Sequence, residues 1–531
     1  MNEDVLEPVQ DHLVIGDRVR TLQDAPDSAH WNAVAIRGGR ILAVGEANDL
    51  KPLLAPDWKI TELPGTTLMP GFHDAHVHLG FHGFELSHVQ LADSDTLEQA
   101  IARLEARAQT ATDGAWLQGS GFSLQRWGIR SPDRAVLDRA FPEIPVLLRS
   151  QDHHSAFVNG AALRAAGITA DTPDPDGGRI VRREDGSASG ELLERATDLV
   201  ASAMPEPSQR ELRDALWTGA RQLASLGITT VHHMAYEPAR NARALAQQAS
   251  REDFPVRVWA CLMQEEIEAA TALGIATGQG GSRYQVGGAK FFVDGALGSL
   301  SAWMLEPYDR HGGTGMVLTD PDVLRERVGL AIAAGLTPVA HAIGDAAVRA
   351  LLDTYEHHAE AWRREGLRPR VEHAQHVHPD DVARLGSLGL IASMQPLHLT
   401  FDAAAIHDTL GSRIDRAFPI RSLQAAGATL AFGSDTPVAP PDVLASLRTA
   451  HDRSGEQGQV VQAGESIDPL DAVRAYTRGP AYAIGWEARS GQLAPGFDAD
   501  LVAWSHDLTQ GVPEGARAVA TMVAGRWTYA S

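Results

Sequence analysis

The feature that most constrains the fold of this chain is a repeated junction between a helix and a strand. Four times, a run with helical character ends at a glycine and passes directly into a short apolar strand: ASLG-ITTVHH, AAGL-TPVAH, GSLG-LIASMQ and AAGA-TLAFGSD. Glycine just after a helix favours the left-handed conformation that ends it. Helices that alternate with apolar strands predict a parallel sheet covered by helices.

The pattern locates eight such strands. They are expected at residues 66–79, 228–235, 256–263, 289–295, 337–342, 369–374, 390–395 and 429–434. Eight parallel strands alternating with helices predict an α/β fold, the (β/α)8 TIM barrel. A ninth apolar run, IPVLLRS at 144–150, falls in a gap that far exceeds an ordinary connection, so we assign it to an insertion at about 80–215.

The two ends of the chain carry short strands of a different kind. Residues 31–45 alternate apolar and polar side chains around Gly38-Gly39, which is typical of a tight hairpin, and ATMVAGRWTYA near the C-terminus turns around Ala524-Gly525. Neither end has enough strands for an independent sheet. We therefore predict one small β-sandwich built from both ends, with domain boundaries at 1–65, 66–488 and 489–531.

Charge and cysteine content limit the compartment and the partners. The 531-residue chain has a formal net charge of −22 and no basic run, which argues against nucleic acid or an anionic membrane as partner. A single cysteine, Cys261, excludes an intrachain disulfide and a thiolate-rich zinc site. No signal-peptide pattern and no apolar stretch of ~18–20 residues is present. We expect a cytoplasmic protein that acts on a small molecule, with a homodimer left open.

Residues 71–80, GFHDAHVHLG, place a cluster of polar side chains where the first barrel strand ends. His76 and His78 are two positions apart, so on a strand their Cβ atoms lie on one face, roughly 6–7 Å apart. Both side chains could therefore bind one metal ion. Asp74 is a candidate to orient a ligand imidazole, although turn chemistry explains an aspartate there nearly as well.

The other ligands should come from further strands, because catalytic groups of a barrel lie at the C-terminal ends of its strands. Lys290 and Asp294 belong to one such end, and His341, His373 and Asp435 belong to later ones. Histidine nitrogen and carboxylate oxygen without thiolate suit zinc, and manganese or iron stay open.

Lys290 is the unusual member of this set, because only three of the 46 basic residues are lysine. A lysine on an apolar strand suggests a role that guanidinium cannot fill. Burial and a nearby metal would lower the pKa of its amine, and a neutral amine can add carbon dioxide to form a carbamate that bridges two metal ions. Pairing of Lys290 with Asp294 is the alternative that the residues alone leave equally open.

The ordered set HxH, Lys, His, His, Asp, with a split flanking sandwich, resembles the amidohydrolase superfamily. Further stretches are similar to its YtcJ-like branch, which includes N-substituted formamide deformylases: GFHDAHVH, KFFVDGALGS, HAIGDAAV, VEHAQ, FGSDTPV and GQLAPGFDADLVAW. The resemblance implies that His76, His78 and Asp435 hold one metal ion. It also implies that His341 and His373 hold a second ion and that a carboxylated Lys290 bridges the two.

The resemblance further implies a metal-dependent hydrolase of a non-peptide C–N bond, in an amide or an N-formyl group. In the expected mechanism a metal-activated hydroxide attacks the carbonyl carbon, and Asp435 acts as general acid and base. Three alternatives stay open: a mononuclear deaminase, a phosphotriester or ester hydrolase on the same barrel, and a non-catalytic binding protein. The residues also leave open whether one or two ions bind.

Candidates for substrate contacts come from position along the chain. His154 matches a stretch of the YtcJ-like branch, HSAFVN in this sequence, with a buried, hydrogen-bonded structural histidine as the alternative. His398 follows the seventh strand near the mouth of the barrel, with the capping of a loop as the alternative to substrate contact. Asp294 ends the strand that carries the lysine. Phe122 and Trp127, in the insertion, could line an apolar pocket, with core packing as the alternative.

Overall fold

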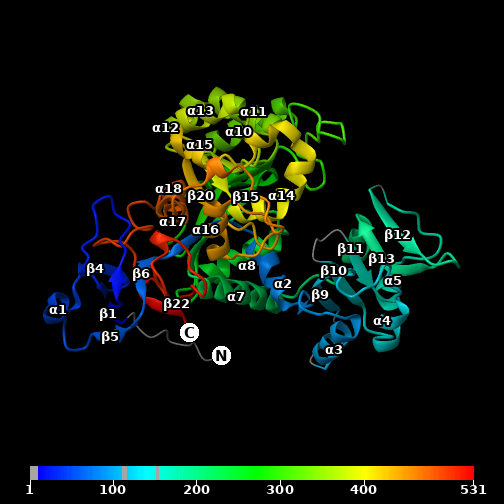
Figure 1. The fold of residues 1–531 in the computed structure, drawn as a ribbon, viewed down its shortest axis with the longest axis horizontal. Helices are drawn as coiled ribbons and strands as arrows, with labels where there is room; N and C mark the ends of the chain where they lie inside the picture. The colour runs from blue at the N-terminus through cyan, green and yellow to red at the C-terminus, as the bar shows by residue number, and fades with distance from the viewer. Residues whose placement is uncertain (1–9, 110–115, 151–154, 176) are drawn as a thin grey trace. The chain divides into compact units, whose positions relative to one another are not determined.

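The computed structural model describes residues 10–109, 116–150, 155–175 and 177–531. The chain divides into two compact units (Figure 1). Residues 1–82 and 219–531 form the first, here called the barrel unit, and residues 83–218 form the second, called the inserted unit. His154 lies outside the described residues, so its assignment to substrate binding stays a prediction.

The barrel unit is built around a sheet of eight parallel strands that follow one another in chain order. The strands are β7 (Phe72–Val77), β14 (Ile228–His233), β15 (Arg257–Met263), β16 (Tyr284–Phe292), β17 (Pro338–Ala342), β18 (Arg370–His373), β19 (Ile391–Met394) and β20 (Thr429–Phe432). The sheet curls until its last strand reaches its first. The amide of Asp435 donates to the carbonyl of His76 at 2.7 Å, and the amide of His78 donates to the carbonyl of Thr436 at 2.9 Å. This arrangement confirms the predicted (β/α)8 barrel.

Helices cover the outside of this sheet, as the repeated junctions predict. They are α8 (Ala239–Ala249), α9 (Ile267–Leu273), α10 (Pro321–Ala333), α11 (Asp345–His357), α12 (Ala359–Arg364), α13 (Pro379–Leu388), α14 (Pro396–Leu410), α15 (Ile420–Ala425), α16 (Val443–Asp452), α17 (Pro469–Ala475) and α18 (Arg478–Ala483). The junction glycines Gly227, Gly335, Gly389 and Gly427 all have left-handed φ angles, between 72° and 95°. The glycine therefore ends the helix and turns the chain into the next strand. Among the described residues, none of the helices is both long and apolar enough to cross a membrane.

Strands from the two chain ends form two further sheets. One has the order β4 (Arg40–Gly45), β3 (Ala33–Arg37), β1 (His12–Ile15) and β5 (Lys59–Glu62), and short α1 (Ala47–Leu50) follows β4. The other has the order β2 (Arg18–Val19), β6 (Thr67–Pro70), β21 (Leu501–Trp504), β22 (Ala518–Val523) and β23 (Arg526–Ala530). Val14 and Ile36 from the first sheet share one buried core with Leu68, Leu501 and Met522 from the second. Both ends of the chain thus build one sandwich.

The predicted strand 66–79 is wrong in one respect, because it is two strands in two sheets. Thr67–Pro70 pairs with β21 in the sandwich, and Phe72–Val77 starts the barrel. The chain changes sheets at Gly71, whose amide donates to the carbonyl of Asp500 at 3.0 Å. A Cβ atom at Gly71 would lie 2.2 Å from the hydroxyl oxygen of Thr229, so only glycine fits there. Because the apolar run continues without a break, the sequence pattern gives no sign of this change of sheet.

The inserted unit has its own sheet, in the order β12 (Gly178–Arg182), β13 (Ala188–Glu194), β11 (Ser155–Val158), β10 (Val146–Ser150), β9 (Leu117–Phe122) and β8 (Val89–Gln90). Its helices are α3 (Leu97–Ala108), α4 (Ala135–Ala140), α5 (Gly160–Ala165) and α6 (Ala196–Ala201), and α2 (Leu79–Ser87) and α7 (Gln209–Ser225) link it along the chain to the barrel unit. The apolar run 144–150 forms β10, so this ninth strand lies outside the barrel sheet.

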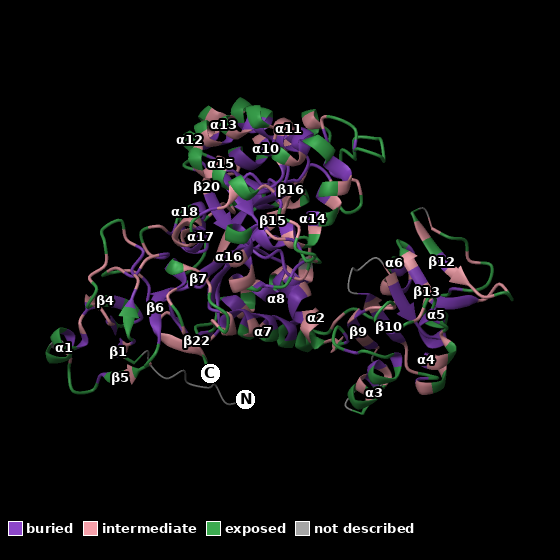
Figure 2. Cartoon of the chain, viewed as in Figure 1, coloured by how far each residue is buried: buried purple, intermediate pink, exposed green. Residues whose placement is uncertain are grey.

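Phe122 and Trp127 pack together in the core of the inserted unit. Their rings stack with centroids 5.2 Å apart, and the two residues are only 2% and 8% exposed. They belong to one buried cluster with Leu104, Phe141 and Phe157. Figure 2 shows that buried positions lie along strands of this unit, such as β10 and β13. The structure therefore supports core packing, the alternative given above for these two side chains, and their assignment to substrate contacts stays a prediction.

Candidate metal centre

The candidate metal centre lies at the C-terminal ends of the barrel strands. His76 on β7, His373 on β18 and Asp435 just after β20 each offer a ligand atom, and these atoms lie within 4.8 Å of one another. All three residues are buried. His373 and Asp435 also have left-handed φ angles of 72° and 63°. Such backbone strain in residues other than glycine is concentrated at functional sites, where the surrounding structure holds it in place.

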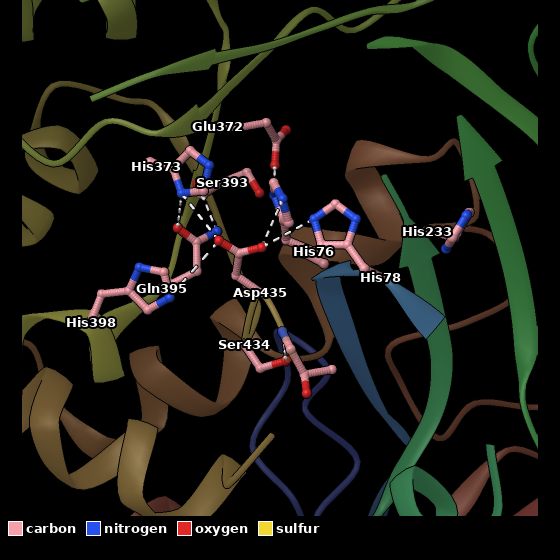
Figure 3. A network of polar contacts seen from close by, with 12 residues as sticks. His76, His78, His233, Glu372, His373, Ser393, Gln395, His398, Ser434 and Asp435 are labelled. Carbon is pink, nitrogen blue, oxygen red and sulfur yellow. Dashed lines mark hydrogen bonds and ion pairs between the residues drawn. The ribbon is translucent and has the colours of Figure 1, made fainter. Parts of the chain in front are cut away.

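The carboxylate of Asp435 is at the middle of the cluster (Figure 3). Its Oδ1 atom faces the Nε2 atoms of His76 at 3.4 Å and of His78 at 3.3 Å. Its Oδ2 atom faces Nδ1 of His373 at 4.0 Å and Nε2 of His398 at 3.9 Å. His341 completes the group, since its ring centroid lies 4.5 Å from that of His373. The structure therefore brings the histidines of the predicted ligand set together around Asp435.

Each ligand histidine uses one ring nitrogen to contact an acceptor in the surrounding protein. A ring nitrogen facing an acceptor carries the proton, so the other nitrogen keeps a lone pair for a metal ion. The acceptors are Glu372 for His76 at 2.7 Å, the Ala235 carbonyl for His78 at 2.9 Å, the Gly295 carbonyl for His341 at 3.0 Å and Gln395 for His373 at 2.8 Å.

Burial keeps the imidazoles of His76, His341 and His373 neutral. It lowers the pKa of His76 and of His341 to about 4, and it lowers the pKa of His373 well below the usual value. A cationic imidazole has no lone pair to donate, so the neutral form is the one that binds a metal ion. At neutral pH the cluster thus offers neutral nitrogen donors beside a carboxylate.

Lys290 lies buried on β16, with an exposed fraction of 1%. Its amine nitrogen has no hydrogen-bond partner among the residues that the structure describes, and it sits 5.1 Å from the ring centroid of Phe292. Burial lowers the pKa of this amine. A buried ammonium without a partner is costly, so the environment favours a neutral amine or a modified one.

Asp294 is not the partner of Lys290, and its oxygens are already occupied. They accept hydrogen bonds from the backbone amides of Trp303 at 2.8 Å, Ile343 at 3.0 Å and Gly344 at 2.8 Å. Burial raises the pKa of Asp294 to about 7. The side chain ties the loops after β16 and β17 together, which corrects the pairing with Lys290, while the assignment of Asp294 to substrate binding stays a prediction.

The residues that orient His76 are Glu372 and Arg370, which the sequence analysis did not single out. Arg370 is fully buried and donates from Nε to Glu372 at 2.7 Å and from Nη2 to the hydroxyl of Ser393 at 2.9 Å. Asp74 has a different role from the one predicted, because its Oδ1 accepts from the backbone amides of His76 and Ser434. The sequence signal that could have identified them is the presence of two charged residues, at positions 370 and 372, in one short buried strand.

We expect Glu372→Gln to weaken metal binding by roughly 10–100-fold, because the neutral amide polarises His76 less than the carboxylate does. Metal affinity would be measured by competition with a chromophoric chelator. Asp74→Asn is the matched control, and it should change the affinity much less because the hydrogen bonds of Asp74 go to the backbone amide of His76 and to Ser434, and not to a ligand imidazole. A larger effect of Asp74→Asn than of Glu372→Gln would show that Asp74 is the residue that orients the ligand.

A model of the amidohydrolase family matches residues 59–529 of the chain. Over 521 residues the chain is 32% identical to protein LONG AFTER FAR-RED 3 of Arabidopsis thaliana, covering 94% of this chain and 88% of the relative. It is 30% identical to the putative amidohydrolase YtcJ of Bacillus subtilis (strain 168), covering 90% and 91%. It is 28% identical to the N-substituted formamide deformylase of Arthrobacter pascens, covering 94% of each.

The fold also matches a solved structure. An uncharacterized metal-dependent hydrolase from Pyrococcus furiosus superposes with a TM-score of 0.78 at 26% sequence identity, covering 94% of this chain and 100% of that chain. The similarity to both sequences and structure extends over nearly the whole chain. The predicted resemblance to the amidohydrolases and to the YtcJ-like branch is confirmed.

Proposed function

Because the chain belongs to the amidohydrolase family, we propose that it hydrolyses a non-peptide C–N bond in a small amide, with N-formyl amines as the first class to test. The observation that carries this proposal is the convergence, at the end of the barrel, of neutral imidazoles, a carboxylate and a buried amine that has no hydrogen-bond partner among the described residues. The similarity to an N-substituted formamide deformylase supports the choice of N-formyl amines.

The donor set fits a divalent metal ion, with zinc first and manganese or iron as alternatives. We assign His76, His78 and Asp435 to one ion, His341 and His373 to a second, and Lys290 to the bridge between them. A metal ion bound there supplies a water molecule of lowered pKa and polarises the carbonyl group of the substrate.

Lys290 would act as a carbamate. Its neutral amine adds carbon dioxide and loses a proton, which converts a nitrogen without a hydrogen-bond partner into a group with two carboxylate oxygens. The burial of the amine and its lowered pKa support this step. An arginine guanidinium stays protonated and cannot add carbon dioxide in this way, which gives a physical reason for a lysine in a chain that otherwise uses arginine.

Asp435 would move the proton. Its carboxylate accepts a proton from the attacking water and passes it to the nitrogen of the leaving amine. The backbone holds the carboxylate in place, because the Asp435 amide donates to the His76 carbonyl across the closure of the barrel. One residue can therefore act first as base and then as acid.

The test compares wild type with Lys290→Ala, both purified without chelator. Metal content per chain is measured by inductively coupled plasma mass spectrometry, and release of free amine is measured for a panel of N-formyl and N-acyl amines. We expect about two metal ions in wild type, falling to about one or fewer in the variant, with amine release lost. Lys59→Ala is the matched control, because Lys59 is exposed on β5 of the sandwich, and it should match wild type.

Other outcomes identify the rival functions. About one metal ion in both proteins, with ammonia released from amino-substituted heterocycles, would make the protein a mononuclear deaminase and overturn the role of Lys290 as a bridge. Turnover of phosphotriesters or esters without amine release would overturn the C–N specificity. Absence of metal in wild type, even after zinc is added back, would support a non-catalytic binding protein.

A further inference from the structure

His398 lies beside the candidate metal centre without belonging to the predicted ligand set. It sits in the first turn of α14 and is only 8% exposed. Its Nε2 atom has no hydrogen-bond partner among the described residues and points at Oδ2 of Asp435 from 3.9 Å (Figure 3). That distance is too long for a hydrogen bond, so the nitrogen is available to a substrate atom. The ring of His398 lies parallel to that of His373, at 18° and 6.2 Å between centroids.

A relay of two side chains determines which nitrogen of His398 carries the proton. Nε2 of Gln375 lies 3.3 Å from Oδ2 of Asp402 and 3.4 Å from Nδ1 of His398. A carboxylate only accepts hydrogen bonds, so Gln375 must turn its NH₂ group toward Asp402. An NH₂ group has two hydrogens, and the second one is donated to His398. Nδ1 of His398 is therefore an acceptor, and in the neutral ring the proton is on Nε2.

We propose that His398 is a catalytic hydrogen-bond donor, whose Nε2–H binds the carbonyl oxygen of the substrate as negative charge develops on it. Gln375 and Asp402 are positioning residues that keep the ring in this tautomer. The inference rests on the proposed amide hydrolysis, because that reaction places a developing negative charge on a carbonyl oxygen. A donor fixed in a buried site stabilises such a charge without reorganising during the reaction.

The relay also excludes two other roles for His398. A metal ligand needs a lone pair on the nitrogen that faces the site, and Nε2 holds a proton instead. A general base needs the same lone pair, so this role stays with Asp435. The two side chains therefore have different roles. Asp435 accepts the proton of the attacking water, and His398 donates a hydrogen bond to the carbonyl oxygen.

The first test measures the tautomer itself by ¹⁵N NMR of protein labelled at histidine, with the His398 signals identified by their loss in His398→Asn. We expect wild type to show the Nε2–H form. Gln375→Glu places a carboxylate, which cannot donate, against Nδ1 and should move the proton to that nitrogen. Gln247→Glu, the same substitution at an exposed position of α8, is the matched control and should leave the signals unchanged. A wild-type Nδ1–H form would overturn the relay.

The second test measures catalysis and metal content in the same proteins. We expect His398→Ala and Gln375→Glu to lower kcat roughly 100–1,000-fold with a much smaller change in KM, and to keep the wild-type metal content. A fall in metal content in His398→Ala would make His398 a ligand, and a loss confined to KM would make it a simple binding contact. Either result overturns the donor role. If wild type hydrolyses no amide, the proposed function fails together with this role, and the NMR result still decides the relay.

Discussion

Asp435→Asn is expected to lower kcat by about a thousandfold or more while most of the metal stays bound. Asparagine has nearly the same size and still offers an oxygen to a metal ion, but it cannot take up a proton from water or return it to the leaving amine. The measurement is steady-state kinetics on an N-formyl amine, together with metal content on the same preparation.

The control for this prediction is Asp408→Asn, because Asp408 is a half-exposed carboxylate near the end of α14 that pairs with Arg310 and His311. That variant should keep wild-type kinetics. Unchanged turnover in Asp435→Asn would remove Asp435 from proton transfer. A loss of activity that parallels a loss of metal would assign it to metal binding alone.

Arg370→Met is expected to lower the free energy of unfolding by about 3–5 kcal/mol, the largest effect on stability that we predict. Arg370 and Glu372 are both fully buried, with Nε and Oε1 2.7 Å apart. Nη1 of Arg370 also lies 2.9 Å from Nδ1 of His232. Methionine fills part of the space but leaves the Glu372 carboxylate buried without its counter-charge. The measurement is equilibrium unfolding in urea of the metal-free protein.

Two further variants separate the ion pair from the loss of packing. Arg364→Met removes an exposed arginine of α12 that pairs with Glu365, and it should cost less than about 1 kcal/mol. Arg370→Met combined with Glu372→Met should be more stable than Arg370→Met alone, because no unpaired charge remains. Equal losses in Arg370→Met and Arg364→Met would contradict the structural role of the buried pair.

The three lysines of the chain differ in burial, and this difference explains why the rarity of lysine is informative. Lys51 and Lys59 lie exposed in the sandwich, where arginine would do as well. Lys290 alone is buried, on the inner strand β16 among the ligand histidines. The rarity of lysine pointed to Lys290, and burial without a hydrogen-bond partner supports a chemical role for it.

The barrel and the group of histidines at its strand ends could be predicted because the information for them is local. Apolar strands, helix-ending glycines and the two hairpins each follow from the conformational preferences of a few neighbouring residues. His76, His78, His341, His373 and Asp435 stand at strand ends, and a parallel barrel brings all such ends to one face. Order along the chain was therefore enough to place these residues in one site.

The tertiary structure decided which atoms each of these side chains contacts. Glu372 reaches His76 across 296 positions of sequence, and the relay from Asp402 through Gln375 to His398 joins a strand end to a helix. No periodic pattern specifies such pairs, because periodicity gives the face of an element and not its partner across the core. The change of sheet at Gly71 was missed for the same reason, and core packing of Phe122 and Trp127 could be named only as an alternative because their stacking on each other is a tertiary contact. The sequence by itself therefore determined the barrel and the kind of residues in its site, while close packing between distant segments decided their hydrogen bonds, tautomers and exposure.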